Sequence, residues 1–187
     1  MPEYTAPSPP PNVAGPLARV IDCPMLLAVR PYRPDDRGAC LAIFDSNTPR
    51  FFAPSERADF AGFLDADPSG YFVAEAGGTV VGCGGVFIRG GADGLYWGGL
   101  CWGMVERARH RAGVGSLLLR ERLTYLARTY PKLEAVLLDT SQHSQTFFVH
   151  FGFEAVKVTP DAYAPGLDRY DMRLPRAALL RLAHGYG

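Results

Sequence analysis

The 187-residue sequence lacks the features that would point to several common classes of protein. Its 19 basic and 19 acidic residues leave no formal net charge, so its bulk charge gives no reason to expect a nucleic acid or an anionic membrane as partner. No apolar run approaches the roughly 20 residues that span a bilayer. No apolar stretch of a signal peptide opens the chain either. We therefore expect a cytoplasmic protein whose partners include neither a nucleic acid nor a membrane.

Cysteine and phosphate-loop motifs are equally sparse. The chain has four widely spaced cysteines and no C-x-x-C pair, which argues against a zinc site, and we expect no metal. Cys83 and Cys101 lie in apolar runs, where a free cysteine usually behaves as a small buried hydrophobe. The sequence contains no G-x-x-x-x-G-K-[ST] loop and no G-x-S-x-G nucleophile elbow.

Composition divides the chain into a short arm and one domain. Residues 1–25 are rich in proline and poor in large hydrophobes, which predicts a flexible or extended arm. Residues 26–187 have the length of one ordinary domain, and the apolar content of the chain, 48%, is enough to fill a core. We expect a single α/β domain in this part.

Apolar periodicity predicts the element order β-α-α-β-β-β-α-β-α-β-β, followed by a short terminal helix. The expected helices begin near Asp35 and span 54–65, 114–130, 144–151 and 177–184. The expected strands are 26–30, 71–75, 79–88, 95–105, 134–140, 153–158 and 168–174, with a glycine-rich turn at 89–94. On the helix at 114–130, leucines recur on one face, and Arg122 is expected to face outward with the other charged residues.

The most informative segment runs from Val105 to Ser116, where a strand pattern meets a helix pattern with glycines at 113 and 115. Amides at a helix N-terminus point outward unpaired, and the helix dipole adds about half a positive charge there. Glycines let a bulky anion approach such a backbone closely. Basic side chains, including Arg109 and Arg111, crowd the same turn. The segment predicts a binding site for an anion, and we expect a pyrophosphate.

Two motifs together resemble the GNAT superfamily of N-acetyltransferases. The run His110-Arg111-Ala112-Gly113-Val114-Gly115 matches the family's Gln/Arg-x-x-Gly-x-Gly/Ala turn, with histidine at the first position. The run Phe147–Glu154 matches a short aromatic helix followed by Gly-Phe. The resemblance covers about residues 27–175. It implies a mixed, mainly antiparallel sheet of six to seven strands, flanked by helices, with a splay between parallel strands 4 and 5.

The resemblance also implies a cosubstrate, acetyl-coenzyme A (acetyl-CoA), lying between strands 100–106 and 134–140. The strand end at 104–106 would hold the pantetheine arm, and the amides of residues 111–116 would hold the pyrophosphate. Ser141 stands where the family often has an asparagine that contacts the cofactor. Phe148 stands where a tyrosine usually protonates the leaving thiolate, a step that phenylalanine cannot perform. The implied cofactor-binding residues are Met104, Val105, Glu106, Arg109, Arg111, Ala112, Gly113, Val114, Gly115, Ser116, Ser141 and Phe148.

Direct attack of an amine on the acetyl group requires that the amine first lose a proton. Glu106 is the candidate base, and the alternative is an ordinary strand-end carboxylate. Weaker candidates are His143, Tyr96 and Asp139. The segment from Asn47 to Arg57 is expected to face the acceptor. Within this segment Glu56 either holds a substrate cation or begins a helix.

The resemblance therefore implies an acetyl-CoA-dependent N-acetyltransferase acting on a small amine. It leaves the oligomeric state open, with a homodimer as one of the alternatives. An enzyme acting on a protein amine is an alternative acceptor class. A non-catalytic acyl-CoA binding or sensing domain is an alternative function, kept open by Phe148. A third reading is an α/β interaction domain in which the glycine turn is accidental.

Overall fold

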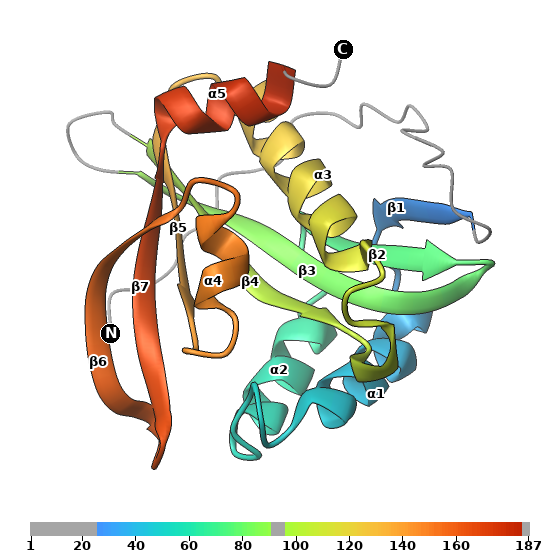
Figure 1. The fold of residues 1–187 in the computed structure, drawn as a ribbon. Helices are drawn as coiled ribbons and strands as arrows, with labels where there is room; N and C mark the ends of the chain where they lie inside the picture. The colour runs from blue at the N-terminus through green and yellow to red at the C-terminus, as the bar shows by residue number, and fades with distance from the viewer. Residues whose placement is uncertain (1–25, 91–95, 185–187) are drawn as a thin grey trace.

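The computed structural model describes residues 26–90 and 96–184, and these residues form one seven-stranded sheet with helices on both faces (Figure 1). The element order expected from the sequence is confirmed. The strands are β1 (Leu27–Pro31), β2 (Tyr71–Ala76), β3 (Thr79–Gly90), β4 (Tyr96–Val105), β5 (Leu133–Thr140), β6 (Glu154–Ala164) and β7 (Leu167–Pro175). The helices are η1 (Pro34–Asp36), α1 (Arg37–Asn47), α2 (Glu56–Asp65), η2 (Arg107–Arg109), α3 (Val114–Thr129), α4 (Gln145–Val149) and α5 (Arg176–His184).

The strands lie in the order β1-β2-β3-β4-β5-β7-β6. Every neighbouring pair is antiparallel except β4 and β5, which are parallel. The mixed, mainly antiparallel α/β sheet implied by the resemblance is therefore confirmed. The β2–β3 hairpin turns at Gly77 and Gly78, whose φ angles of 58° and 81° suit glycine.

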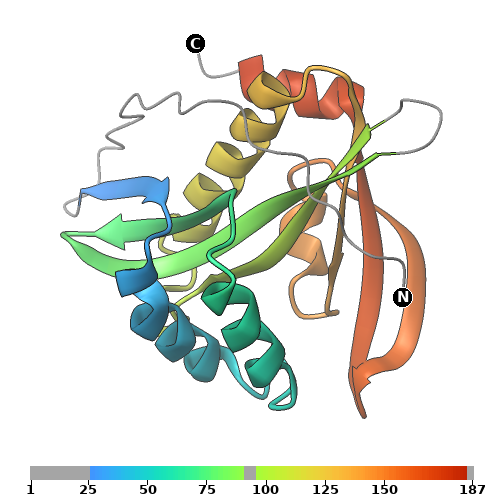
Figure 2. The same cartoon turned by 180° about the vertical axis from the view of Figure 1, so that it is seen from behind.

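Two apolar layers hold the helices against opposite faces of the sheet (Figures 1 and 2). On one face, α3 and α5 pack against the middle of the sheet, with Leu123 beside Val136 and Leu138 of β5. On the other face, α1 and α2 pack against Tyr71 and Val73 of β2. Because side chains alternate along a strand, the intervening Phe72 packs with the α3 layer instead. The α1 and α2 layer lies over strands β2 to β4.

The last two strands are longer than expected. The sequence predicted strands at 153–158 and 168–174 with a connecting loop, whereas β6 continues to Ala164 and β7 begins at Leu167. The hairpin turn is reduced to Pro165 and Gly166, and Gly166 has a φ of 76°. The register shifts between Thr159 and Ala164, so irregular pairing concealed the strand in the sequence pattern.

The expectation that Arg122 faces outward is wrong. Its side chain is buried between α3 and the sheet, with only 3% of the residue exposed. Its guanidinium lies against Gly84 of β3 and Gly103 of β4, which have no side chains to occupy that space. Burial lowers the pKa of Arg122.

Some expectations fall outside the described residues. These are the arm at 1–25, including Cys23, and most of the expected glycine-rich turn at 89–94. Cys40 and Cys83 are buried free thiols, and Cys101 is a half-buried one. None of the described helices combines the length and the apolar character needed to span a membrane.

Candidate functional site

The central parallel strands separate along half their length. Pairing between β4 and β5 runs from Tyr96 opposite Leu133 to Gly99 opposite Leu137 and then stops. Beyond this point β4 continues to Val105 and β5 to Thr140. Backbone groups on the facing edges of an opening have no ladder partner there and favour a ligand that can hydrogen-bond to them. The implied splay is confirmed, whereas Tyr96 lies at the closed end, away from the opening.

A bulge in β4 lies beside this opening. Cys101 pairs with Gly85 and Met104 with Cys83, so Trp102 and Gly103 together face Gly84. Trp102 has a φ of 44°, which is uncommon for a large side chain. Its carbonyl accepts a hydrogen bond from the Tyr71 hydroxyl at 3.1 Å. The sequence pattern does not predict this bulge, although the glycines on β3 and β4 are a signal of it.

The N-terminus of α3 adjoins the end of β4. Arg111 and Gly113 have φ angles of 64° and 82°, which turn the chain into the helix. The first intrahelical hydrogen bond is donated by the Leu117 amide to the Gly113 carbonyl at 3.0 Å, so the amides at 114–116 precede it. A Cβ atom on Gly113 would meet nothing within 4 Å, and this backbone is therefore open to approach. A Cβ atom on Gly115 would lie 3.6 Å from Cγ2 of Val105 and 3.7 Å from the Phe147 ring.

The end of β4 is fixed by hydrogen bonds within the protein. The Val105 carbonyl accepts from Nδ2 of Asn47 at 2.8 Å and lies 3.0 Å from Nε2 of His110. The Glu106 amide donates to the Val81 carbonyl at 2.8 Å. These two backbone groups, named in the sequence analysis as pantetheine contacts, therefore already have partners. Asn47, the first residue of the expected acceptor segment, is buried at the end of α1.

Ser141 directly follows β5, and Phe148 lies on α4, the next helix along the chain. Ser141 is 3% exposed, and its hydroxyl has no hydrogen-bond partner among the described residues. A buried unpaired hydroxyl costs about 1–3 kcal/mol, so a ligand that pairs with Ser141 would recover this energy. Phe148 makes edge contacts with the rings of Phe147 and Phe153, with centroid distances of 5.1 and 5.7 Å.

The candidate bases lie in different surroundings. Glu106 is 43% exposed at its side chain, and its carboxylate lies 3.8 Å from Nε of Arg109. His143 is exposed on the turn after β5 and contacts the edge of the Phe51 ring at 5.9 Å between centroids. The Phe51 ring also contacts His110 at 5.3 Å. Phe51 therefore connects the turn that follows β4 with the turn that follows β5.

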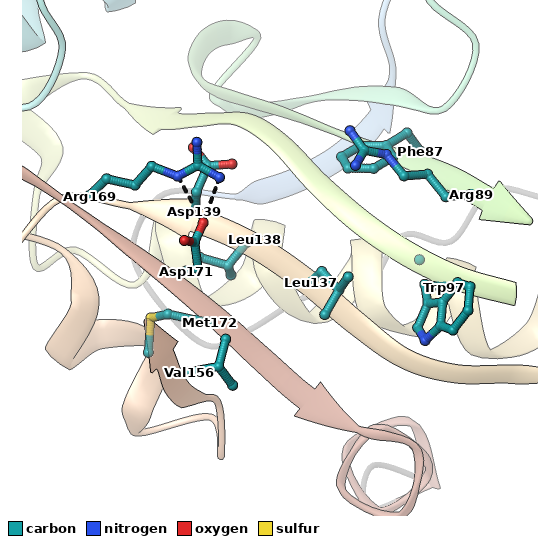
Figure 3. Close-up of a pocket in the computed structure, with 11 residues that line it drawn as sticks. Phe87, Arg89, Trp97, Leu137, Leu138, Asp139, Val156, Arg169, Asp171 and Met172 are labelled. Carbon is teal, nitrogen blue, oxygen red and sulfur yellow. Dashed lines mark hydrogen bonds and ion pairs between the residues drawn. The ribbon is translucent and has the colours of Figure 1, made fainter. Parts of the chain in front are cut away.

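A pocket lies against the part of the sheet from β3 to β7 (Figure 3). Arg169 and Asp171 of β7 form an ion pair with an N–O distance of 2.6 Å. Asp139 of β5 lies beside this pair. The lining residues are Phe87, Arg89, Trp97, Gly98, Leu137, Leu138, Asp139, Val156, Arg169, Asp171 and Met172.

Glu56 begins α2 near the same pocket. Its Oε2 accepts a hydrogen bond from the Ala53 amide at 2.7 Å, as a helix-start carboxylate does. Burial raises the pKa of Glu56, and the negative charge of Asp139 raises it further. Within residues 26–90 and 96–184, no three His, Cys, Asp or Glu side chains lie close enough together to hold a metal ion.

A sheet with separated central parallel strands, next to a helix N-terminus with open amides, defines the acetyltransferase class of α/β protein. The model of the acetyltransferase (GNAT) family matches residues 40–153, and the chain belongs to this family.

Solved structures of the class share the fold. A protein of Desulfovibrio desulfuricans ascribed to the GNAT family has 23% identity and a TM-score of 0.65, covering 80% of this chain and 98% of that one. A protein described as a phosphinothricin N-acetyltransferase has 20% identity and a TM-score of 0.64, with coverage of 80% and 98%. The ribosomal-protein-alanine N-acetyltransferase of Brucella melitensis has 19% identity and a TM-score of 0.59, with coverage of 79% and 98%. No curated protein sequence matches the chain.

Proposed function

We propose that the chain is an N-acetyltransferase that transfers an acetyl group from acetyl-CoA to the amine of a small molecule by direct attack. The observation that carries the proposal is the junction of the β4–β5 opening with the open amides at the start of α3. The thioester supplies an activated acetyl group. The residues of the chain bind and orient the two substrates and remove a proton from the amine.

Acetyl-CoA fits the donor and acceptor groups that surround the opening. Its pyrophosphate would accept hydrogen bonds from the amides at 113–116, with Arg109 and Arg111 as neighbouring cations. The Ala112 amide already donates to the Arg109 carbonyl at 3.3 Å. Its pantetheine amides would pair with the facing edges of β4, near Met104, and of β5. The unpaired hydroxyl of Ser141 is a further donor at the same opening. Phe148 would pack against the bound arm.

Glu106 is the proposed base at the end of β4, and His143 is a second candidate. Both side chains reach solvent, so each can exchange a proton with water. The ammonium loses one proton, its nitrogen bonds to the acetyl carbon, and the carbon–sulfur bond breaks as the nitrogen loses a second proton to solvent. The leaving thiolate takes a proton from solvent, because Phe148 has none to give.

Two alternatives have specific support. Phe148, with its aromatic packing and no proton to donate, favours a non-catalytic acyl-CoA binding domain. A protein amine as acceptor is supported by the similar fold of an enzyme described as acting on a ribosomal protein.

We further propose a single domain at 26–187, a cytoplasmic location and no need for a metal. A homodimer is supported by Val156 and Val158, which are 61% and 45% exposed on the edge strand β6.

The experiment is a calorimetric titration of the full chain with acetyl-CoA, followed by an assay of free thiol release with a panel of amines. We expect saturable binding and amine-dependent release. An absence of binding would contradict both the transferase and the binding-domain readings. Binding without turnover by any amine would favour the binding domain. If thiolate protonation limits the rate, Phe148→Tyr should raise kcat, whereas an unchanged kcat would show that another step is slow.

A further inference from the structure

Asp139 lies at the edge of the opening, on the face away from α3. It is two residues beyond Leu137, the last residue of β5 that pairs with β4. Val136 and Leu138 belong to the core beneath α3, so alternation places the side chains of Leu137 and Asp139 on the opposite face. If the cofactor is held from the α3 side, the acceptor must reach the acetyl group from this other face. Asp139 is therefore on the acceptor's path.

Tyr163 of β6 forms a hydrogen bond with Asp139. Its hydroxyl donates a hydrogen bond to Oδ2 of Asp139 at 2.5 Å. The hairpin that carries Tyr163 is tied to Gln142, three residues after Asp139 in the chain. Nε2 of Gln142 donates to the Gly166 carbonyl at 2.7 Å, and its Oε1 accepts from the Asp168 amide at 3.0 Å. The pair is thus held in place by the protein before any ligand arrives.

The charges around the pair favour a cation. Burial, with a further contribution from the hydrogen bond to Asp139, raises the pKa of Tyr163. The phenol therefore keeps its proton, which it shares with Asp139, and its oxygen lone pairs remain available to a donor. Arg169 forms its ion pair with Asp171, and its charge also acts on Asp139. Among the described residues, neither Asp139 nor Glu56 forms an ion pair with a basic side chain. The charged and titratable groups that influence Tyr163 and Asp139 from the neighbouring elements are Glu56 of α2, Cys101 of β4, and Arg169 and Asp171 of β7.

Mainly apolar side chains continue from this polar end, and beyond them the Arg89 guanidinium lies 5.1 Å from the centroid of the Phe87 ring. Trp97 and Leu137 line the pocket along β4 and β5, and Phe87 of β3 lies over Gly99 (Figure 3). A ligand with its charged end at Asp139 would lay the rest of its body against these side chains. The pocket therefore suits a molecule that is cationic at one end and apolar along its length.

We propose that Tyr163 and Asp139 bind the ammonium group of the acceptor and take its proton, and that the acceptor is a primary amine on an apolar body. This inference rests on the proposed function, adds an acceptor class to it, and gives the role of base to Tyr163 and Asp139 in place of Glu106 or His143. One ammonium proton passes to the Tyr163 oxygen as the phenolic proton moves to Oδ2 of Asp139. The freed nitrogen lone pair then forms the bond to the acetyl carbon, and the carbon–sulfur electron pair leaves with the sulfur. The nitrogen loses its second proton to solvent, and the thiolate takes a proton from solvent.

The test compares the wild type with Tyr163→Phe and Asp139→Asn, using phenethylamine, tyramine and tryptamine as acceptors. We expect each variant to lower kcat/KM by about 100-fold at pH 7, the usual contribution of a positioned base. The loss should shrink toward pH 10, because a primary amine has a pKa of about 10.4 and a growing fraction of it arrives already deprotonated. The affinity for acetyl-CoA, measured by titration, should not change. Phenethyl alcohol, which has no ammonium group, should not inhibit, whereas the quaternary trimethyl derivative of phenethylamine should compete with the amine.

Matched controls remove a similar group elsewhere. Asp35→Asn removes one exposed carboxylate ahead of α1, and Tyr125→Phe removes a hydroxyl from α3 beside Phe72; both should keep wild-type kcat/KM. A loss that is equal at every pH, or no loss, would overturn the assignment of Tyr163 and Asp139. Acetyl-CoA binding without turnover of the three amines would overturn the acceptor class. A wild-type chain that does not bind acetyl-CoA would instead overturn the proposed function.

Discussion

Gly84 of β3 and Arg122 of α3 fit so closely that a Cβ atom on Gly84 would lie 2.7 Å from Nη1 of Arg122. A Cβ atom on Gly103 of β4 would lie 3.0 Å from the same nitrogen. Within the described part of the chain, the guanidinium donates to two backbone carbonyls, those of Leu118 and Gly85, at 3.3 and 3.4 Å. Two strand glycines therefore make the room for a buried cation beneath the β4 bulge.

Gly84→Ala should lower the free energy of unfolding by about 1–3 kcal/mol, the usual effect of overpacking. Arg122 is buried and cannot swing into solvent, so the methyl group must displace either the guanidinium or the bulge. Urea unfolding measures the change. Gly62→Ala is the control, because a Cβ atom at this position in α2 meets nothing within 4 Å and should stabilise the helix. Equal stability of Gly84→Ala and the wild type would contradict the close packing of Gly84 against the Arg122 guanidinium.

Arg122→Met should change the free energy of unfolding by less than about 1.5 kcal/mol, because the loss of a buried charge offsets the loss of two long hydrogen bonds. Arg122→Ala should lower it by about 2–5 kcal/mol, because it leaves a cavity. Urea unfolding of both variants, and of Gly84→Ala combined with Arg122→Met, gives the comparison. In the Arg122→Met background, Gly84→Ala should lower the free energy of unfolding by less than it does in the wild type. Additive effects would show that the two residues do not interact.

Asp36→Asn should lower the free energy of unfolding by about 1.5–3 kcal/mol at neutral pH, the range for hydrogen bonds to charged groups. Asp36 accepts from Nη1 and Nη2 of Arg30 at 2.7 and 2.8 Å and from the Arg33 amide at 2.8 Å. The hydrogen bonds from Arg30 hold the pKa of Asp36 below its usual value of 3.8. A lowered folded-state pKa gives stability that is present above the unfolded pKa and is lost as the pH falls through the folded one.

The difference in unfolding free energy between wild type and Asp36→Asn should therefore shrink as the pH falls below about 4. Urea unfolding at several pH values measures it. Asp65→Asn, which breaks the exposed pair with Arg37, is the control and should have little effect at any pH. A difference that stays constant down to low pH would contradict the role given to Asp36.

Gly113→Asp should weaken acetyl-CoA binding by more than about 100-fold, because it places a negative charge where the phosphates are proposed to bind. Gly113 also has a φ of 82°, a conformation that asparagine tolerates about as well as aspartate. Gly113→Asn therefore controls for backbone strain and should weaken binding much less. Calorimetric titration of both variants provides the measurement. Unchanged affinity in Gly113→Asp would remove the α3 N-terminus from the site.

Ser141→Ala should leave the ligand-free Tm unchanged or raise it, because it removes a buried hydroxyl that has no partner in the described structure. The same change should weaken acetyl-CoA binding, and so reduce the rise in Tm that saturating acetyl-CoA produces. Thermal unfolding with and without the ligand measures both effects. A fall in the ligand-free Tm together with full ligand stabilisation would show that the hydroxyl is structural.

Local patterns in the sequence predicted much of the fold. The leucine spacing of α3 identified the helix, because a buried stripe requires that period. The turn around Gly113 was visible because two glycines stand where a strand pattern meets a helix pattern, and glycine adopts the observed φ of 82° without strain. The order of elements followed from such signals, and the strand separation followed from the family resemblance.

Contacts between residues far apart in the sequence could not be predicted from such local patterns. Arg122 was expected at the surface because a charged side chain usually is, and only Gly84 and Gly103 explain its burial. Tyr163 fell in an expected loop, and its partner Asp139 lies 24 residues earlier in the chain. Such pairs depend on strand register, which tertiary packing sets.

The end of pairing after Gly99 and Leu137 gives the sheet two inner edges in addition to the outer edges at β1 and β6. Amide hydrogens along these inner edges should exchange with solvent faster than those of the continuous ladder between β3 and β4. An amide-bearing ligand that spans both edges would act as an added strand and join the two halves into one cooperative unit. In this protein, ligand binding would then complete the secondary structure itself.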